Sequence, residues 1–115
     1  MAVTMTDHPA LDLAPLVVPD YAPDLTPSQR FALFHERNPH VADLLERLAA
    51  EWFAAGNSKV GVKALAEQAR WASGLATTSE PWRINNTHVA FYSDLLIQRN
   101  PDWETRIERR RRTAD

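Results

Sequence analysis

The sequence contains no cysteine and only three glycines in its 115 residues. Without cysteine, disulfide bonds and thiolate metal sites are excluded, and an intracellular setting is the simpler expectation. The glycines are too few and too widely spaced for a glycine-rich phosphate loop. No apolar run approaches the roughly 20 residues that span a bilayer. No basic residue precedes the first apolar stretch, so a secretory signal is not expected.

Residues that commonly bind metals or catalyse reactions also lack a recognisable arrangement. The four histidines are His8, His35, His40 and His88. A helix break separates His35 from His40, and five residues is the wrong spacing for two ligands on one helical face. No serine or pair of carboxylates stands in a known catalytic context. The sequence therefore predicts a protein that is not an enzyme and holds no metal or other cofactor.

The length fits one domain, and the charge is divided unevenly along it. Residues 1–57 carry a net charge of −5 and residues 58–115 a net charge of +3, which together give the overall −2. An acidic first half and a basic second half suggest two surfaces with different roles. The alternative is that these charges only solvate the surface.

Residues 1–25 are interpreted as an extended, proline-rich arm, followed by one helical domain over residues 26–112. Four prolines disfavour helix in the arm. Apolar side chains lie between them, more than a disordered tail is expected to have. The arm should therefore dock, either on its own domain or on another chain as in a homo-oligomer. The arm residues expected to make contacts are Leu13, Leu16, Val17 and Tyr21.

Four capping signals divide the remainder into helices: Thr26-Pro27, Asn38-Pro39, Ser58 after Gly56, and Asn100-Pro101. The apolar spacing predicts helices over 27–37, 39–55 and 59–73, a fourth from Asn85 or Asn86 to Arg99, and a fifth after Asn100. Thr26 and Gln29 form a capping box. Residues 75–85 are expected to form a short β-hairpin or loop. The predicted fold is mainly α, with a helix-turn-helix or winged-helix-like core.

A basic stripe favours binding of double-stranded DNA. The short turn Gly56-Asn57-Ser58 is typical of a helix-turn-helix, and Lys59, Lys63 and Arg70 follow on one side of the next helix. Further candidates are Arg83 in a wing, Asn85, Asn86, and the C-terminal run that includes Arg109 and Arg110. The alternatives are a solvated helix edge for the stripe and a simple helix cap for the asparagines. The bulky Trp52 before the turn and the pI of about 6.1 argue against DNA binding.

The four tryptophans favour a second function, the binding of a host or phage protein. Trp52 and Trp103 fit the core stripes of their helices, whereas Trp71 and Trp82 do not. These two either pack against each other or are exposed as contact residues. A protein partner would then bind through the arm and an exposed tryptophan.

Residues 38–109 resemble small proteins of unassigned function encoded by bacteriophages and prophages. The resemblance rests on Asn-Pro-His-Val at 38–41, Ser-Lys-x-Gly-x-Lys-x-Leu at 58–65, Arg-Trp at 70–71, Gly-Leu-x-Thr-Thr at 74–78, Ile-Asn-Asn at 84–86 and Ala-Phe-Tyr at 90–92. It implies a phage or prophage origin and a place of work in the host cytoplasm. It implies no activity and no functional residue. The leading hypothesis is a non-enzymatic, phage-type DNA-binding or regulatory protein, and the alternative is a protein-interaction module.

Overall fold

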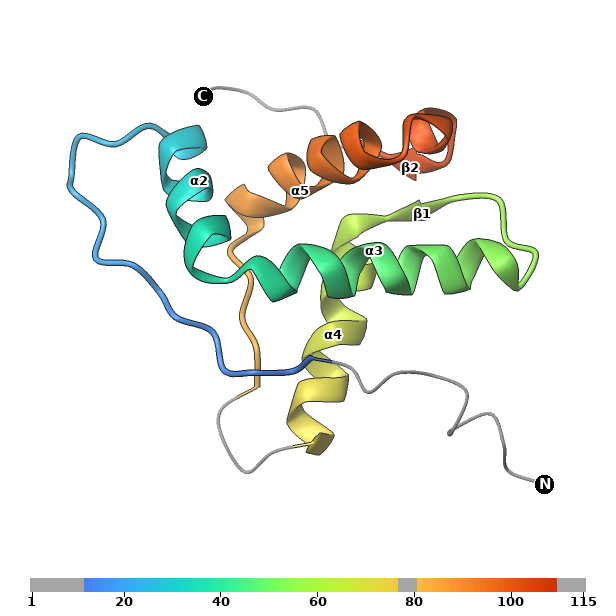
Figure 1. Ribbon diagram of the computed structural model, residues 1–115, viewed down its shortest axis with the longest axis horizontal. Helices are drawn as coiled ribbons and strands as arrows, with labels where there is room; N and C mark the ends of the chain where they lie inside the picture. The colour runs from blue at the N-terminus through green and yellow to red at the C-terminus, as the bar shows by residue number, and fades with distance from the viewer. Residues whose placement is uncertain (1–11, 77–80, 110–115) are drawn as a thin grey trace.

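The computed structural model describes residues 12–76 and 81–109 and is mainly helical (Figure 1). Its elements are α2 (Pro27–Arg37), α3 (Pro39–Ala54), β1 (Val60–Gly61), α4 (Val62–Ala76), α5 (Asn86–Arg99), the 3₁₀ helix η1 (Pro101–Thr105) and β2 (Ile107–Glu108). Of the predicted helices, the first matches α2 at both ends, and the second and fourth match α3 and α5 within one residue. None of the helices in the described residues has the length and apolarity needed to cross a membrane.

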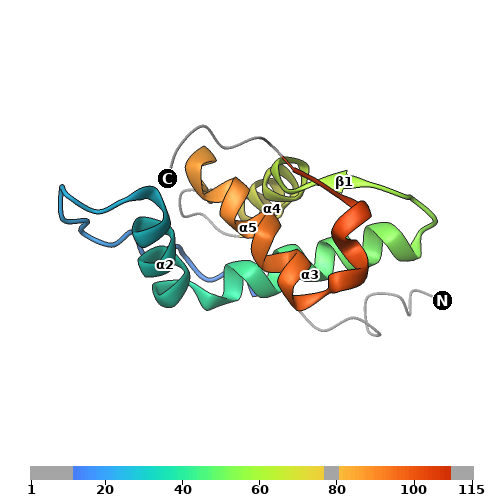
Figure 2. The same ribbon diagram turned by 90° about the horizontal axis from the view of Figure 1, so that it is seen from above.

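Helix α5 lies at the centre of the packing, because α2, α3 and α4 all contact it. In Figure 1, α5 runs above α3, whereas α4 crosses α3 steeply and extends below it. Figure 2 shows α4 and α5 next to each other, in agreement with their contacts. The fully buried side chains Val41, Leu45, Val62, Tyr92 and Leu96 form the centre of the core. They come from three helices, so burial of this apolar surface fixes the helices relative to one another.

Of the four predicted caps, the Thr26 cap is present as predicted. The Thr26 side chain accepts from Gln29 N–H at 3.2 Å, and the Gln29 side chain accepts from Thr26 N–H at 2.9 Å. Gly56 has a φ of 102°, as expected for a left-handed residue after a helix. Asn38 and Asn100 precede α3 and η1 but make no side-chain capping bond. Their side chains bind elsewhere, so the predicted role of these two asparagines is wrong.

The prediction for the third helix is wrong at both ends. Residues 55–61 separate α3 from α4, so the three-residue turn predicted between them is absent. Val60 instead pairs in parallel with Ile107, and its N–H donates to the Arg106 carbonyl at 3.0 Å. This pairing with a segment more than 40 residues away holds residues 60–61 extended, which local sequence patterns cannot reveal. At the other end, α4 continues through Gly74 to Ala76.

The C-terminal part also differs from expectation. The predicted fifth helix is only the 3₁₀ helix η1, because the chain turns after Thr105 to form β2. Of the short β-hairpin or loop predicted over 75–85, residues 75–76 belong to α4, and residues 81–85 form no helix or strand, which agrees with the loop. Residues 77–80 lie outside the described part of the chain.

Two helix faces are more exposed than predicted. Trp52, expected in the core, is 44% exposed, and its Nε1–H donates to the Lys59 carbonyl at 2.7 Å. The second apolar side predicted for the third helix is also exposed, at Ala64 and Trp71. Helix α4 is therefore buried on one side only, and a broad face remains open to solvent.

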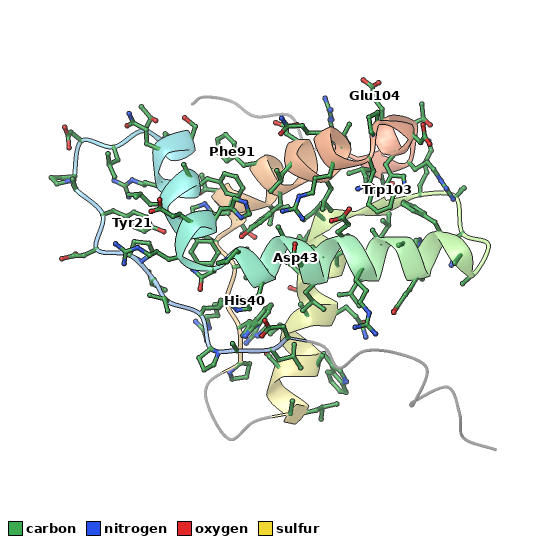
Figure 3. All side chains as sticks on the ribbon, in the orientation of Figure 1. Tyr21, His40, Asp43, Phe91, Trp103 and Glu104 are labelled. Carbon is green, nitrogen blue, oxygen red and sulfur yellow. The ribbon has the colours of Figure 1, made fainter. Side chains whose placement is uncertain are left out.

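Residues 12–25, here called the arm, carry no helix or strand and fold back on their own domain (Figure 1). Asn38 accepts from Val17 N–H and donates to the Val17 carbonyl, both at 2.7 Å. The Ala14 carbonyl lies 3.0 Å from His40 Nε2 and accepts from Trp82 Nε1–H at 3.1 Å. Figure 3 shows His40 at the start of α3, close to the arm. These contacts hold the arm against the start of α3 and against the segment that carries Trp82.

Candidate nucleic-acid interface

A groove of about 650 Å³ lies between the arm, α4 and the start of α5. It is here called the basic groove. Val18 and Tyr21 of the arm form one wall, and Phe34, Trp82 and Val89 contribute apolar lining. The polar residues that line it are Lys63, Glu67, Arg70, Arg83, Asn85, Asn86 and His88. Five of these seven were predicted from the sequence as DNA-binding residues.

The periodicity of α4 places its charged residues on the groove. Leu65, Ala69 and Ser73 are buried, so the side chains at 63, 67 and 70 point to the opposite, exposed side at about 100° per residue. Lys63, Glu67 and Arg70 are all exposed. Glu67 stands between the two cations, and it was not among the residues predicted from the sequence, although its i, i+4 spacing from Lys63 indicates this position.

Arg83 reaches the groove because its neighbour Trp82 is fixed in the core. Trp82 is 3% exposed, and its backbone N–H donates to Ser73 Oγ at 3.0 Å. Ser73 Oγ in turn donates to the Arg70 carbonyl at 2.8 Å. One buried hydroxyl therefore joins the segment carrying Arg83 to the turn of α4 that carries Arg70.

The start of α5 supplies two asparagines. Asn85 caps the helix, since its side-chain oxygen accepts from Thr87 N–H at 2.8 Å. The simple capping interpretation of Asn85 is therefore correct, and the cap leaves the amide NH₂ for another contact. Asn86 is the first residue of α5 and is exposed.

A buried histidine lies under the groove. His88 is 4% exposed, and its Nε2 lies 3.5 Å from the Tyr21 hydroxyl, a contact that no sequence pattern indicated. Its Nδ1 has no hydrogen-bond partner among the described residues. Burial lowers the pKa of His88 and so favours the neutral ring. The charge of the groove therefore comes from Lys63, Arg70 and Arg83 against Glu67.

The three basic side chains of the groove differ from Arg99 in their ionic partners. None of Lys63, Arg70 and Arg83 forms an ion pair with another residue in the described ranges. Arg99, by contrast, is 3.0 Å from both Asp43 and Glu46 on the other side of the molecule. The groove therefore presents positive charge that is available to an anionic partner.

Three predicted DNA-binding residues are not gathered in the groove. Lys59 lies in the linker before β1 and does not line it. Arg109 lines a neighbouring hollow of about 430 Å³, which it shares with Lys63, and its Nε is 3.7 Å from Asp94. Arg110 lies outside the described residues.

The predicted protein-binding residues do not form one exposed surface. Leu13 and Leu16 pack against the core of their own chain, Tyr21 is half-buried and Val17 is 51% exposed. No contact between the rings of Trp71 and Trp82 is present. Trp82 is buried and cannot be the exposed tryptophan, whereas Trp71 is 66% exposed. Trp71 lines a hollow of about 390 Å³ together with Glu67, Arg70, Gly74, Leu75 and Pro81.

Within the described ranges, no cluster of three or more His, Cys, Asp or Glu side chains could hold a metal ion. No family model, curated protein or solved structure matches this chain. The function is therefore argued from the basic groove itself.

Proposed function

We propose that this protein binds DNA through the basic groove, without enzymatic activity. The observation that carries the proposal is the convergence of Lys63, Arg70 and Arg83, all without an ion pair to a described residue, on one groove. Lysine and arginine bind phosphate oxygens and supply most of the affinity of a protein for DNA. Amide groups such as those of Asn85 and Asn86 donate to phosphates or to base edges.

In this proposal α4 serves as the recognition helix of a winged-helix-like core, with segment 81–85 beside it, although a longer linker with β1 replaces the short turn of a helix-turn-helix. A regulatory role, a phage or prophage origin and the host cytoplasm are part of the proposal through the resemblance of residues 38–109 to phage proteins. Arg109 lies in the hollow next to Lys63, but its Nε is 3.7 Å from Asp94, so the proposal assigns the phosphate contacts to the groove rather than to Arg109.

The test compares two lysines that lie four residues apart. Lys63 lines the groove and Lys59 does not, and both are exposed. Lys63→Glu and Lys59→Glu therefore change the net charge equally, and only Lys63→Glu changes a residue that lines the groove. Binding of a short fluorescent duplex is followed by anisotropy across a salt series.

Wild type should bind with log affinity falling linearly with log salt. Lys63→Glu should weaken binding at least 10-fold and flatten the salt slope by roughly 0.9 for each phosphate that the variant no longer binds. Lys59→Glu should bind nearly as wild type. Absence of binding at low salt, or equal effects of the two substitutions, would refute the proposal.

A second candidate function, the binding of a protein, is favoured by the exposure of Trp71 and Leu75, which are 66% and 74% exposed. Large apolar side chains exposed side by side are typical of interaction surfaces. The two functions respond differently to substitution. Protein binding through this patch should survive Lys63→Glu and be abolished by Trp71→Ala.

A further inference from the structure

Trp71 lies on the same exposed face of α4 as the basic groove. It follows Arg70 directly, and Arg70 and Glu67 line both the groove and the hollow beside Trp71. The two hollows therefore adjoin each other at Glu67 and Arg70. Eight residues from Lys63 to Trp71 correspond to about 12 Å at the rise of an α-helix.

The two ends of this surface differ in chemistry. Lys63, Arg70 and Arg83 suit phosphate groups. The hollow beside Trp71 holds an exposed indole, Leu75, Gly74 and Pro81, a mostly apolar set that suits a flat ring. A ligand that fills both must carry negative charge along a chain and aromatic rings beside that chain.

We infer that the ligand of the basic groove is single-stranded nucleic acid, with one base stacked on Trp71 and the adjoining phosphates on Lys63, Arg70 and Arg83. The inference rests on the proposed function and specifies its ligand. Proteins that bind single strands combine a cationic groove with aromatic side chains on which bases stack. In a duplex the bases are stacked and paired inside the helix and would have to be extruded to reach an indole.

Charge favours this ligand over an apolar protein surface. Three cations face one carboxylate in the groove, and none of the three cations is paired with a described residue. A purely apolar partner would leave these cations desolvated and unmatched at the edge of the contact. A strand matches the cations with phosphates and the indole with a base.

The test measures the affinity of the full chain for a fluorescent oligothymidine strand, and for a duplex containing it, at one moderate salt concentration and then across a salt series. The variants are Trp71→Ala, Trp71→Phe and, as control, Trp52→Ala. Trp52 is 44% exposed on α3, and it lines neither hollow. Circular dichroism checks that each variant is folded.

Wild type should bind the strand more tightly than the duplex. Trp71→Ala should reduce strand affinity roughly 10-fold or more without changing the salt slope, because stacking releases no counterions. Trp71→Phe should retain most of the affinity. Trp52→Ala should bind as wild type, and strand binding should quench tryptophan fluorescence in wild type more than in Trp71→Ala.

Equal strand affinity of Trp71→Ala and wild type, or tighter binding of the duplex, would overturn this inference. In those cases the proposed function would still stand if Lys63→Glu weakened duplex binding selectively. Failure of both polymers to bind would overturn the inference and the proposed function together.

Discussion

Replacing Asn38 by alanine should detach the arm and destabilise the fold. Asn38 is fully buried and makes three side-chain hydrogen bonds. Two join it to the N–H and carbonyl of Val17, and the third is donated to the Phe34 carbonyl at 2.9 Å. The Asn38 side chain therefore forms both backbone hydrogen bonds of Val17, as a neighbouring β-strand would. It also binds the end of α2.

The expected destabilisation follows from these three bonds. A hydrogen bond contributes about 1 kcal/mol net, and a buried group left without a partner costs about 1–3 kcal/mol. Val17 is 51% exposed, so water can replace part of the hydrogen bonding that its backbone has with Asn38. We therefore expect Asn38→Ala to lower the free energy of unfolding by about 2–3 kcal/mol.

Asn100 provides a matched control. It too precedes a proline, and its φ of −134° is close to the −133° of Asn38. Its side chain is half-buried and makes two bonds, to Glu46 Oε2 at 2.8 Å and to the Leu96 carbonyl at 3.1 Å. Asn100→Ala should therefore cost less, about 1 kcal/mol, and should leave the arm in place.

Urea unfolding gives the free energies of unfolding of the two variants. Amide hydrogen exchange reports directly whether the arm is docked. The Val17 amide should lose protection in Asn38→Ala and keep it in Asn100→Ala. Equal destabilisation by the two substitutions, or a Val17 amide that stays protected without Asn38, would show that the arm is held by other contacts and refute the reasoning.

Two further predictions concern the core around the groove. Burial lowers the pKa of His35 and His88 below 6.5. At acidic pH the unfolded chain therefore binds protons at these histidines more readily than the folded protein does. The free energy of unfolding should therefore be highest above about pH 6.5 and fall below it by at most about 1.4 kcal/mol per pH unit for each histidine. Urea unfolding at about pH 7.5 and 5.5 checks this, and no difference between the two would contradict it. Ser73→Ala leaves the buried Trp82 N–H without a partner and should cost about 1–3 kcal/mol in thermal or urea unfolding. Ser93→Ala is its control and should cost less, since the buried Ser93 hydroxyl only donates to the Val89 carbonyl of its own helix; equal costs would refute the role of Ser73.

The sequence predicts this fold well where local chemistry decides it. The capping box at Thr26 and the proline at position 27 place the start of α2, and the apolar spacing places α3 and α5. Each of these signals acts over a few residues, so it survives in any tertiary context that buries the same face.

Prediction fails where distant residues decide the local structure. Residues 57–61 would suit a helix start, but the Arg106 guanidinium donates to the Asn57 carbonyl at 3.0 Å and to the Ser58 carbonyl at 3.2 Å. Together with the pairing of Val60 and Ile107, these bonds hold the segment extended. Trp52 is exposed for the same reason, because its indole donates to the Lys59 carbonyl of this extended segment rather than entering the core.

The candidate site also combines residues that the sequence predicts with residues that it does not. Lys63 and Arg70 follow from helical spacing, and they lie on one exposed face of α4 as predicted. The wall made by Tyr21 and the burial of His88 depend on where the arm docks, and no periodicity in the sequence encodes that position. Lys59 does not line the groove because residues 60–61 form strand β1 and α4 begins only after them.

Because Val18 and Tyr21 form one wall of the basic groove, docking of the arm and binding of a ligand are linked. A ligand that contacts this wall binds the docked form, so its apparent affinity scales with the docked fraction. Reciprocity then requires that the bound ligand stabilise the docked arm by the same free energy. The Val17 amide should therefore exchange more slowly in the complex than in the free protein, because its hydrogen bond to Asn38 Oδ1 is present only while the arm is docked. A ligand held only by Lys63, Arg70 and Arg83 would leave that amide unchanged, so the exchange rate at Val17 separates binding in the groove from binding on its outer edge.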